Sequence, residues 1–265
     1  MQVEDSRRGI GLDAPGGEKV ALVQGASRGI GFAITQALLS RGEYRRVFAT
    51  CRRPDEATRL GELRSRSERL AVLRLDVLDE ESITASAEHI RLSGGRLDLL
   101  VNCAGVLHED GGLWPEKRLA DVDAHGVEAA FRVNALGALL VARGFEGILR
   151  SSPSACFAAL SARVGGIADN RRGGWYAYRA SKAALNMMIR TLAIEWGRLP
   201  RPISCFALHP GTVATDLSAP FRRNLAGNQV FDPGEAAGRL LSTIDSLTQE
   251  QSGGFFAYDG TRIEW

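Results

Sequence analysis

Cysteine, histidine and long apolar runs are all scarce in this chain of 265 residues. Its four cysteines are widely spaced and form no Cys-x-x-Cys pair, so we expect reduced thiols in a cytoplasmic protein rather than a disulfide framework. Its four histidines are too scattered for a metal site, and we expect no metal. No run reaches the ~18 apolar residues that a membrane-spanning helix needs.

An excess of charge of one sign is also missing. The chain has 33 Lys and Arg against 31 Asp and Glu, a net charge of +2, so nothing indicates a nucleic-acid or membrane partner. Lysine itself is rare: Lys19, Lys117 and Lys182 are the only three, and the other basic residues are arginines. A lysine in a meaningful pattern is therefore informative here.

Short apolar runs alternate with longer helical patterns along the chain. Runs of this kind are typical of parallel strands that are buried on both faces. The runs are Val20–Val23, Val47–Thr50, Leu70–Leu75, Leu97–Val101, Cys156–Leu160, Ile203–Leu208 and Gly254–Tyr258. The helical patterns are Ile30–Ser40, Asp55–Arg66, Glu80–Leu92, Val122–Leu149, Trp175–Arg198 and Gly234–Leu247. The alternation predicts one α/β domain over residues 19–265: a doubly wound, seven-stranded parallel sheet of the Rossmann type, with helices on both faces.

Two stretches fall outside this pattern. Residues 1–18 are expected to form an N-terminal extension, because the Arg7-Arg8 pair lacks the apolar stretch that follows it in an export signal. The stretch Gly211–Phe231 is the least regular part of the domain. We expect a segment that covers the substrate there.

A glycine-rich turn follows the first expected strand and precedes the first helix. Glycines let a backbone turn sharply, approach a pyrophosphate and pack a helix tightly on a strand, and the helix N-terminus then offers unpaired N–H groups to the phosphates. A glycine-rich turn is often only a turn, but the strand before it and the helix after it favour a dinucleotide site. The predicted contacts are Gly25, Ser27, Arg28, Gly29, Ile30 and Gly31.

The end of the second expected strand, Phe48–Arg53, contains no carboxylate. An acidic residue there would bind a ribose 2′-hydroxyl and repel a 2′-phosphate. Arg52, with Arg53 beside it, can instead pair with a phosphate dianion, and Arg28 can approach from the glycine turn. This pattern predicts NADP(H) rather than NAD(H); the alternative is a solvated basic surface.

Tyr178 and Lys182 stand four residues apart at the start of an expected helix, and so on one of its faces. A carbonyl reduction needs a proton donor beside the hydride acceptor, and free tyrosine, with a pKa of ~10, is a weak one. A nearby ammonium lowers that pKa; reaching 7 requires roughly 3 pKa units, or ~4 kcal/mol. With four tyrosines and three lysines in the chain, this spacing rarely arises by chance.

The glycine spacing, the Tyr-x-x-x-Lys pair and Asn102-Cys103-Ala104-Gly105 together resemble the short-chain dehydrogenase/reductase family, from about Lys19 to the C-terminus. Gln24 and Cys103 depart from that family's usual Thr and Asn. The segments 161–165, 173–178 and 255–260 resemble the branch of C-factor signalling proteins and sniffer-type carbonyl reductases.

The resemblance implies roles for particular residues. Tyr178 would be the general acid/base, Lys182 would lower its pKa and hold the nicotinamide ribose, and Asn134 would support a water and the lysine. The family's substrate-binding serine falls on Ala162, which leaves Ser161 as the candidate although neighbouring strand residues point to opposite faces. The resemblance places further cofactor contacts at Asp76, Val77, Asn102, Ala104, Gly105, Pro210, Gly211, Val213 and Thr215.

The resemblance implies an NADP(H)-dependent oxidoreductase that reduces an aldehyde or ketone to an alcohol, on a small molecule that the sequence does not identify. It also implies a homodimer or homotetramer. The substituted serine keeps open a second function, a signalling or regulatory protein that binds cofactor with little turnover. A sugar-nucleotide epimerase also uses Tyr-x-x-x-Lys, but the chain is short for it and the glycine spacing differs.

Overall fold

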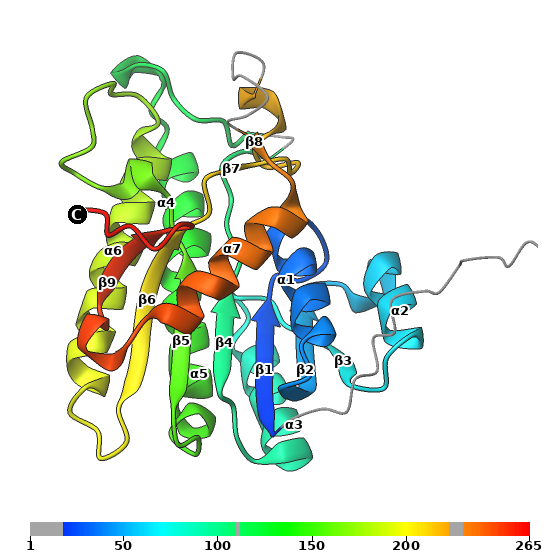
Figure 1. Cartoon of the computed structure of the whole chain (residues 1–265). Helices are drawn as coiled ribbons and strands as arrows, with labels where there is room; N and C mark the ends of the chain where they lie inside the picture. Colours follow the sequence, from blue (N-terminus) through cyan, green and yellow to red (C-terminus); the bar gives the residue numbers. More distant parts are fainter. Residues whose placement is uncertain (1–17, 110–111, 223–229) are drawn as a thin grey trace, which may run out of the picture.

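The computed structural model describes residues 18–109, 112–222 and 230–265. Its centre is a sheet of seven parallel strands in the order β3-β2-β1-β4-β5-β6-β9 (Figure 1). The strands are β1 (Lys19–Gln24), β2 (Tyr44–Cys51), β3 (Leu70–Arg74), β4 (Leu99–Asn102), β5 (Ala155–Leu160), β6 (Ile203–His209) and β9 (Gly254–Ala257). The predicted doubly wound α/β fold is confirmed. Apart from Glu18, the expected N-terminal extension lies outside the described residues.

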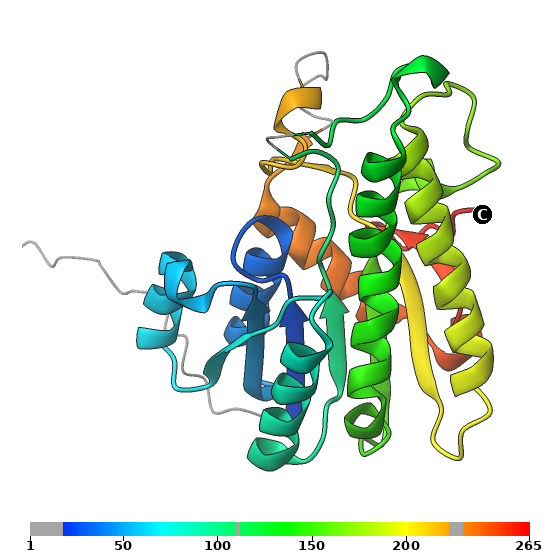
Figure 2. The same ribbon diagram turned by 180° about the vertical axis from the view of Figure 1, so that it is seen from behind.

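Helices cover both faces of the sheet because successive strand residues point to opposite sides. In β1, Val20 and Leu22 join one hydrophobic core, and Ala21 and Val23 join the other. The first core is completed by helices α3 (Glu80–Gly94), α5 (Gly137–Leu149) and α6 (Tyr176–Trp196), and the second by α1 (Gly29–Ser40), α2 (Thr58–Ser65) and α7 (Pro233–Ser246). Figure 1 looks onto α1 and α7, and Figure 2 shows the opposite layer in front.

The parallel pairings bring the carboxyl ends of all seven strands to one edge of the sheet. β1 lies between β2 and β4. Strands β2 and β3 are added on one side of β1 and strands β4, β5, β6 and β9 on the other, so the strand order reverses at β1. Open α/β sheets bind ligands outside the carboxyl ends of their strands at such a switch point. The glycine turn follows β1 directly and therefore stands at this place.

The expected long helix over Val122–Leu149 contains an irregularity. It begins at residue 124 as α4 (Ala124–Phe131), widens to a π-helical segment (Arg132–Leu136) and continues as α5. Single π-helical turns inside α-helices often mark functional sites, and this one contains Asn134. The expected helix over Asp55–Arg66 is shorter, because a 3₁₀ turn (Pro54–Glu56) precedes α2.

The stretch expected to be irregular carries a small second sheet. Its strands β7 (Thr212–Val213) and β8 (Val230–Phe231) pair in parallel, and a 3₁₀ turn (Ala219–Phe221) lies between them in sequence. Both strands lie beyond the carboxyl edge of the main sheet (Figure 1).

All four cysteines are free thiols. No helix in the described part of the chain combines the length and the apolar character needed to cross a membrane.

Candidate active site

The glycine turn closes tightly at the end of β1. Gly25 and Gly29 have φ angles of +78° and +55°, in the left-handed region that favours glycine. A Cβ on Gly31 would collide with the carbonyl oxygen of Gly25. The backbone N–H groups of Gly25 and Ala26 both donate to the carbonyl oxygen of Thr50, at 3.0 and 2.9 Å. The turn is thereby fixed to β2, and the N-terminus of α1 faces the ligand edge of the sheet.

Gln24, which replaces the family's usual threonine, joins this turn to β4. Its side chain is buried, and its Oε1 accepts a hydrogen bond of 3.1 Å from the backbone N–H of Ala104. A Cβ on Gly25 would lie 3.0 Å from the same nitrogen, so only glycine fits beside it. Asn102 is buried at the end of β4, and its Oδ1 has no partner among the described residues. Bare backbone and an unpaired oxygen at this edge fit a dinucleotide.

Three arginines predicted to contact the 2′-phosphate occupy different environments. Arg52 is exposed at the end of β2 and forms no ion pair with the described residues. Arg53 pairs with Glu56 at 2.8 Å. Arg28 pairs with Asp216 at 3.2 Å, across the glycine turn. Of the three, only the guanidinium of Arg52 is without a carboxylate partner in the described part of the chain.

The remaining predicted cofactor contacts lie along the same edge. Asp76 accepts a hydrogen bond of 3.0 Å from the N–H of Leu78, just after β3, and Val77 beside it is buried. Pro210 and Gly211 follow β6, and Val213 is buried in β7. Farther along, the methyl group of Thr215 reaches within 3.1 Å of where a Cβ on Gly29 would lie. The segment after β6 thus lies against the glycine turn.

Lys182 is almost completely buried on the face of α6 that also carries Tyr178. Its Nζ donates a hydrogen bond of 2.8 Å to the carbonyl oxygen of Leu160, the last residue of β5, and lies 5.8 Å from the centroid of the Tyr178 ring. No carboxylate in the described residues pairs with it. Burial lowers the pKa of Lys182 to about 8, with a smaller opposing effect of Cys103.

Gly165 allows this close approach of α6. A Cβ there would lie 2.7 Å from the Cβ of Lys182, closer than atoms of two side chains can pack. The residue belongs to the segment after β5 and was not among the predicted site residues. The sequence pattern that could have identified it is its spacing, three residues after the position expected for the family's serine.

In the protein chain without cofactor, the pKa of Tyr178 is raised, and the expected lowering by Lys182 stays a prediction for the complex with cofactor. Burial raises the pKa of Tyr178 to about 12. The physical reason is desolvation, which disfavours the charged phenolate. At neutral pH the phenol is therefore protonated, which is the form that donates a proton.

Asn134 locks the end of β4 to α6. Its Oδ1 accepts from the N–H of Val106 at 2.7 Å, and its Nδ2 donates to the carbonyl oxygen of Val106 at 2.8 Å and to Oγ of Ser181 at 3.0 Å. A Cβ on Gly105 would lie 3.3 Å from Oδ1 of Asn134 and 3.4 Å from Nζ of Lys182. Both side chains therefore lie over Gly105. The support of a water by Asn134 stays a prediction.

Ser161 does not present its hydroxyl to a substrate. The side chain is 4% exposed, and Oγ donates a hydrogen bond of 2.6 Å to Oδ1 of Asn186 in α6. Ala162 follows in extended conformation, with φ −144° and ψ 144°, and is half-buried. The side chains of Ser161 and Ala162 therefore point to opposite sides, as successive residues of extended backbone do. The position expected for the family's serine carries only a methyl group.

Glu116 was not predicted as a site residue, because no pattern in the sequence singles it out. Its buried carboxylate accepts from the backbone N–H of Ala177, at 3.2 and 3.3 Å, and its backbone carbonyl accepts from Trp175 N–H at 2.5 Å. A carboxylate at this point satisfies the first turn of α6 and complements the helix dipole. It fixes the start of the helix that carries Tyr178.

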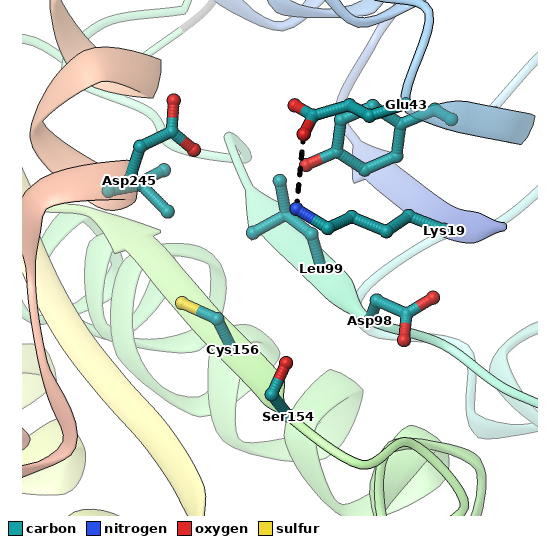
Figure 3. A pocket seen from close by; sticks show the side chains of 9 residues that line it. Lys19, Glu43, Asp98, Leu99, Ser154, Cys156 and Asp245 are labelled. Atoms are coloured by element: carbon teal, nitrogen blue, oxygen red, sulfur yellow. Dashed lines mark hydrogen bonds and ion pairs between the residues drawn. The ribbon is translucent and has the colours of Figure 1, made fainter. Parts of the chain in front are cut away.

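A hollow of about 290 Å³ lies at the opposite edge of the sheet (Figure 3). It is lined by residues that include Lys19, Leu99 and Cys156, near the amino-terminal ends of β1, β4 and β5. This position is remote from the Tyr178–Lys182 pair and from the edge where such sheets bind ligands.

The described residues contain no group of three His, Cys, Asp or Glu side chains arranged to hold a metal ion.

The model of a known family, described as short chain dehydrogenase, matches residues 19–226. The chain belongs to the short-chain dehydrogenase family. It is 37% identical to the C-signal of Myxococcus xanthus over 171 residues, which are 64% of this chain and 94% of that one. The structure of carbonyl reductase Sniffer of D. melanogaster matches with a TM-score of 0.82 and 27% identity, covering 94% of this chain and all of that one.

A second similar structure is a carbonyl reductase from chicken fatty liver with NADPH bound. Its TM-score is 0.84 and its sequence is 31% identical. The match covers 94% of this short-chain dehydrogenase and all of the carbonyl reductase chain. These likenesses confirm the predicted family and its C-factor-like and sniffer-type relatives.

Proposed function

We propose that this short-chain dehydrogenase reduces an aldehyde or ketone to an alcohol with NADP(H), using Tyr178 as general acid. The observation that carries the proposal is the pair of Tyr178 and buried Lys182 on one face of α6, at the carboxyl edge of β4 and β5. A phenol beside an ammonium, at the edge where the dinucleotide turn also lies, is suited to protonating a carbonyl oxygen.

The preference for NADP(H) is supported by charge. Arg52 stands at the end of β2 without a carboxylate partner in the described residues, and no acidic residue takes the place that would bind a free ribose 2′-hydroxyl. A planar guanidinium pairs with phosphate through two parallel hydrogen bonds. The NADPH-bound carbonyl reductase from chicken fatty liver agrees with this choice.

Each residue of the site has a separate task in the proposed reaction. The dinucleotide, when bound, supplies hydride to the carbonyl carbon. Tyr178 donates its phenolic proton to the carbonyl oxygen as charge develops there, and the Lys182 ammonium stabilises the resulting phenolate. Asn134 positions the segment after β4 through its hydrogen bond with Val106. Glu116 positions the start of α6, which carries Tyr178 and Lys182, through its hydrogen bond with Ala177.

The test is NADPH oxidation with a panel of aldehydes and ketones, compared with NADH. The proposal expects turnover with NADPH, a clear preference over NADH, and loss of at least about 100-fold in kcat for Tyr178→Phe with the NADPH dissociation constant unchanged. Turnover by Tyr178→Phe at the wild-type rate would refute the role of Tyr178. A preference for NADH would refute the role of Arg52.

A second function is favoured by one observation, the methyl group of Ala162 where the family's serine is expected, with the Ser161 hydroxyl engaged by Asn186. A protein that binds cofactor and acts on a partner as a signal needs no efficient substrate hydrogen bond. Complete inactivity across the carbonyl panel, together with tight NADPH binding, would favour this regulatory role.

The cytoplasmic location and the homodimeric or homotetrameric state stay predictions. Static light scattering of the purified full chain measures the second directly.

A further inference from the structure

Four aromatic rings from three separate segments gather beside Tyr178. Trp175, just before α6, has its ring centroid 6.1 Å from that of Tyr178 and 5.0 Å from that of Phe221. Trp114 and His108 extend the group through Phe221, with centroid separations of 5.6 and 5.7 Å. Trp175, Phe221, Trp114 and His108 are called the aromatic wall below.

The backbone at Trp175 is unusual. Gly173, Gly174 and Trp175 form three consecutive left-handed residues, with φ of 64°, 64° and 54°. Trp175 is the one non-glycine residue with positive φ in the described part of the chain. A bulky L-residue is disfavoured there because its Cβ crowds a carbonyl oxygen. Strain of this kind persists only where the surroundings enforce it, and it concentrates at functional sites.

The surroundings hold this conformation from two sides. On one side, the N–H of Trp175 donates to the carbonyl oxygen of Glu116 at 2.5 Å, and a Cβ on Gly174 would lie 3.2 Å from that oxygen. On the other side, Nε of Arg179 donates to the carbonyl oxygen of Gly174 at 3.0 Å. The backbone conformation from which the Trp175 side chain projects is therefore held by contacts within the protein.

The wall belongs to neither hydrophobic core. Trp114 is 53% exposed, and Trp175 and Phe221 are half-buried. Large apolar rings that gather outside a core are typical of binding surfaces. The nearest group with chemistry is the phenol of Tyr178, which meets Trp175 edge to face at 76°.

We propose that Trp175 is a specificity-determining residue, which favours carbonyl compounds whose carbonyl carbon bears an aromatic ring. Aromatic rings prefer edge-to-face or offset contacts, and within the wall the ring of Trp175 lies at such a distance from Tyr178. An aryl group resting on Trp175 would direct its carbonyl oxygen toward the phenol. This inference rests on the proposed function.

The experiment compares benzaldehyde with butanal as substrates for NADPH oxidation. The wild type is expected to prefer benzaldehyde in kcat/KM, and Trp175→Ala to lower that preference about 10-fold, through a higher KM for benzaldehyde and an unchanged KM for butanal. Trp175→Gly removes the ring and also relieves the left-handed strain. It should lose the same selectivity, so that the loss follows the ring and not the backbone.

The matched control is Tyr176→Ala, which removes an adjacent aromatic ring that is 42% exposed and lies outside the wall. Its preference should equal that of the wild type, and NADPH should bind all four proteins equally. An unchanged preference in Trp175→Ala, or the same loss in Tyr176→Ala, would overturn the inference.

Failure of the proposed function has a different signature. In that case wild-type protein consumes NADPH with neither aldehyde. Saturation-transfer NMR with benzyl alcohol and butan-1-ol then tests the wall alone: a benzyl alcohol signal that disappears in Trp175→Ala supports it, and equal signals in both proteins overturn it.

Discussion

The Ser161 hydroxyl donates a hydrogen bond of 2.6 Å to Oδ1 of Asn186, one helical turn beyond Lys182 on α6. This bond ties the end of β5 to the helix that carries the proton donor. It gives Ser161 a structural task and leaves position 162 as the place where a substrate hydrogen bond is missing. Two substitutions separate these tasks.

Ser161→Ala should weaken the fold more than the chemistry. It leaves the buried Asn186 oxygen without its donor, which costs roughly 1–3 kcal/mol of the free energy of unfolding. We expect a lower midpoint in urea denaturation and a kcat within about 3-fold of wild type. A loss of kcat above about 100-fold at unchanged stability would restore Ser161 as a substrate-binding residue.

Ala162→Ser should raise activity. The position is extended, half-buried and at the carboxyl edge of β5, so a hydroxyl there could donate to the substrate's carbonyl oxygen. One added donor of this kind is worth about 10-fold or more in kcat/KM. Steady-state kinetics of the single variant and of Ala162→Ser with Tyr178→Phe measure it; an increase that survives loss of Tyr178 would contradict the proposed geometry.

Arg52→Ala should weaken NADPH binding and spare NADH. Loss of a charge-assisted contact to the 2′-phosphate is worth about 10-fold in the dissociation constant, or ~1.4 kcal/mol. Arg53→Ala is the matched control, because Arg53 is adjacent and already pairs with Glu56. Fluorescence titration with each cofactor distinguishes them, and equal effects of both substitutions would indicate a merely basic surface.

Gly165→Ala should reduce kcat by displacing α6. The added methyl would lie 2.7 Å from Cβ of Lys182, so α6 and the segment after β5 must separate, and a shift of ~1 Å in a catalytic group can cost 100-fold. Gly147→Ala, in α5, has nothing within 4 Å of the new methyl and should leave kcat unchanged, with slightly higher stability. Equal kcat for both variants would contradict the close packing at Lys182.

The buried ammonium of Lys182 predicts a particular pH dependence of stability. Its pKa is about 8 in the folded protein against 10.5 as the ordinary value, so the unfolded chain binds the proton more tightly. The penalty for charging Lys182, roughly 3 kcal/mol, is present in full below pH 8 and disappears as the pH rises from 8 to 10.5.

The test compares wild type with Lys182→Met by urea denaturation at pH 7 to 10. The variant lacks this penalty, so its stability advantage over wild type should shrink as the pH rises through that window. Tyr178, whose pKa is raised by burial, changes stability in the opposite direction and does so in both proteins. A difference that stays constant with pH would contradict the buried charge.

The sequence by itself determined what depends on local spacing. The alternation of strands and helices determines the layered architecture. A strand that is apolar on both faces must be covered on both, and a parallel sheet between two layers of helices does this. Gly25, Gly29 and Gly31 are required by backbone geometry within one turn. Tyr178 and Lys182 share a helix face because four residues make about one helical turn.

Only the tertiary structure decided the contacts between distant segments. Glu116 reaches the start of α6 from 61 residues away, and Gln24 meets Ala104 across 80 residues. The raised pKa of Tyr178 and the lowered pKa of Lys182 follow from burial, which is a property of the packed layers and not of the spacing between the two residues. The left-handed backbone at Trp175 is likewise held by distant segments, through the carbonyl oxygen of Glu116.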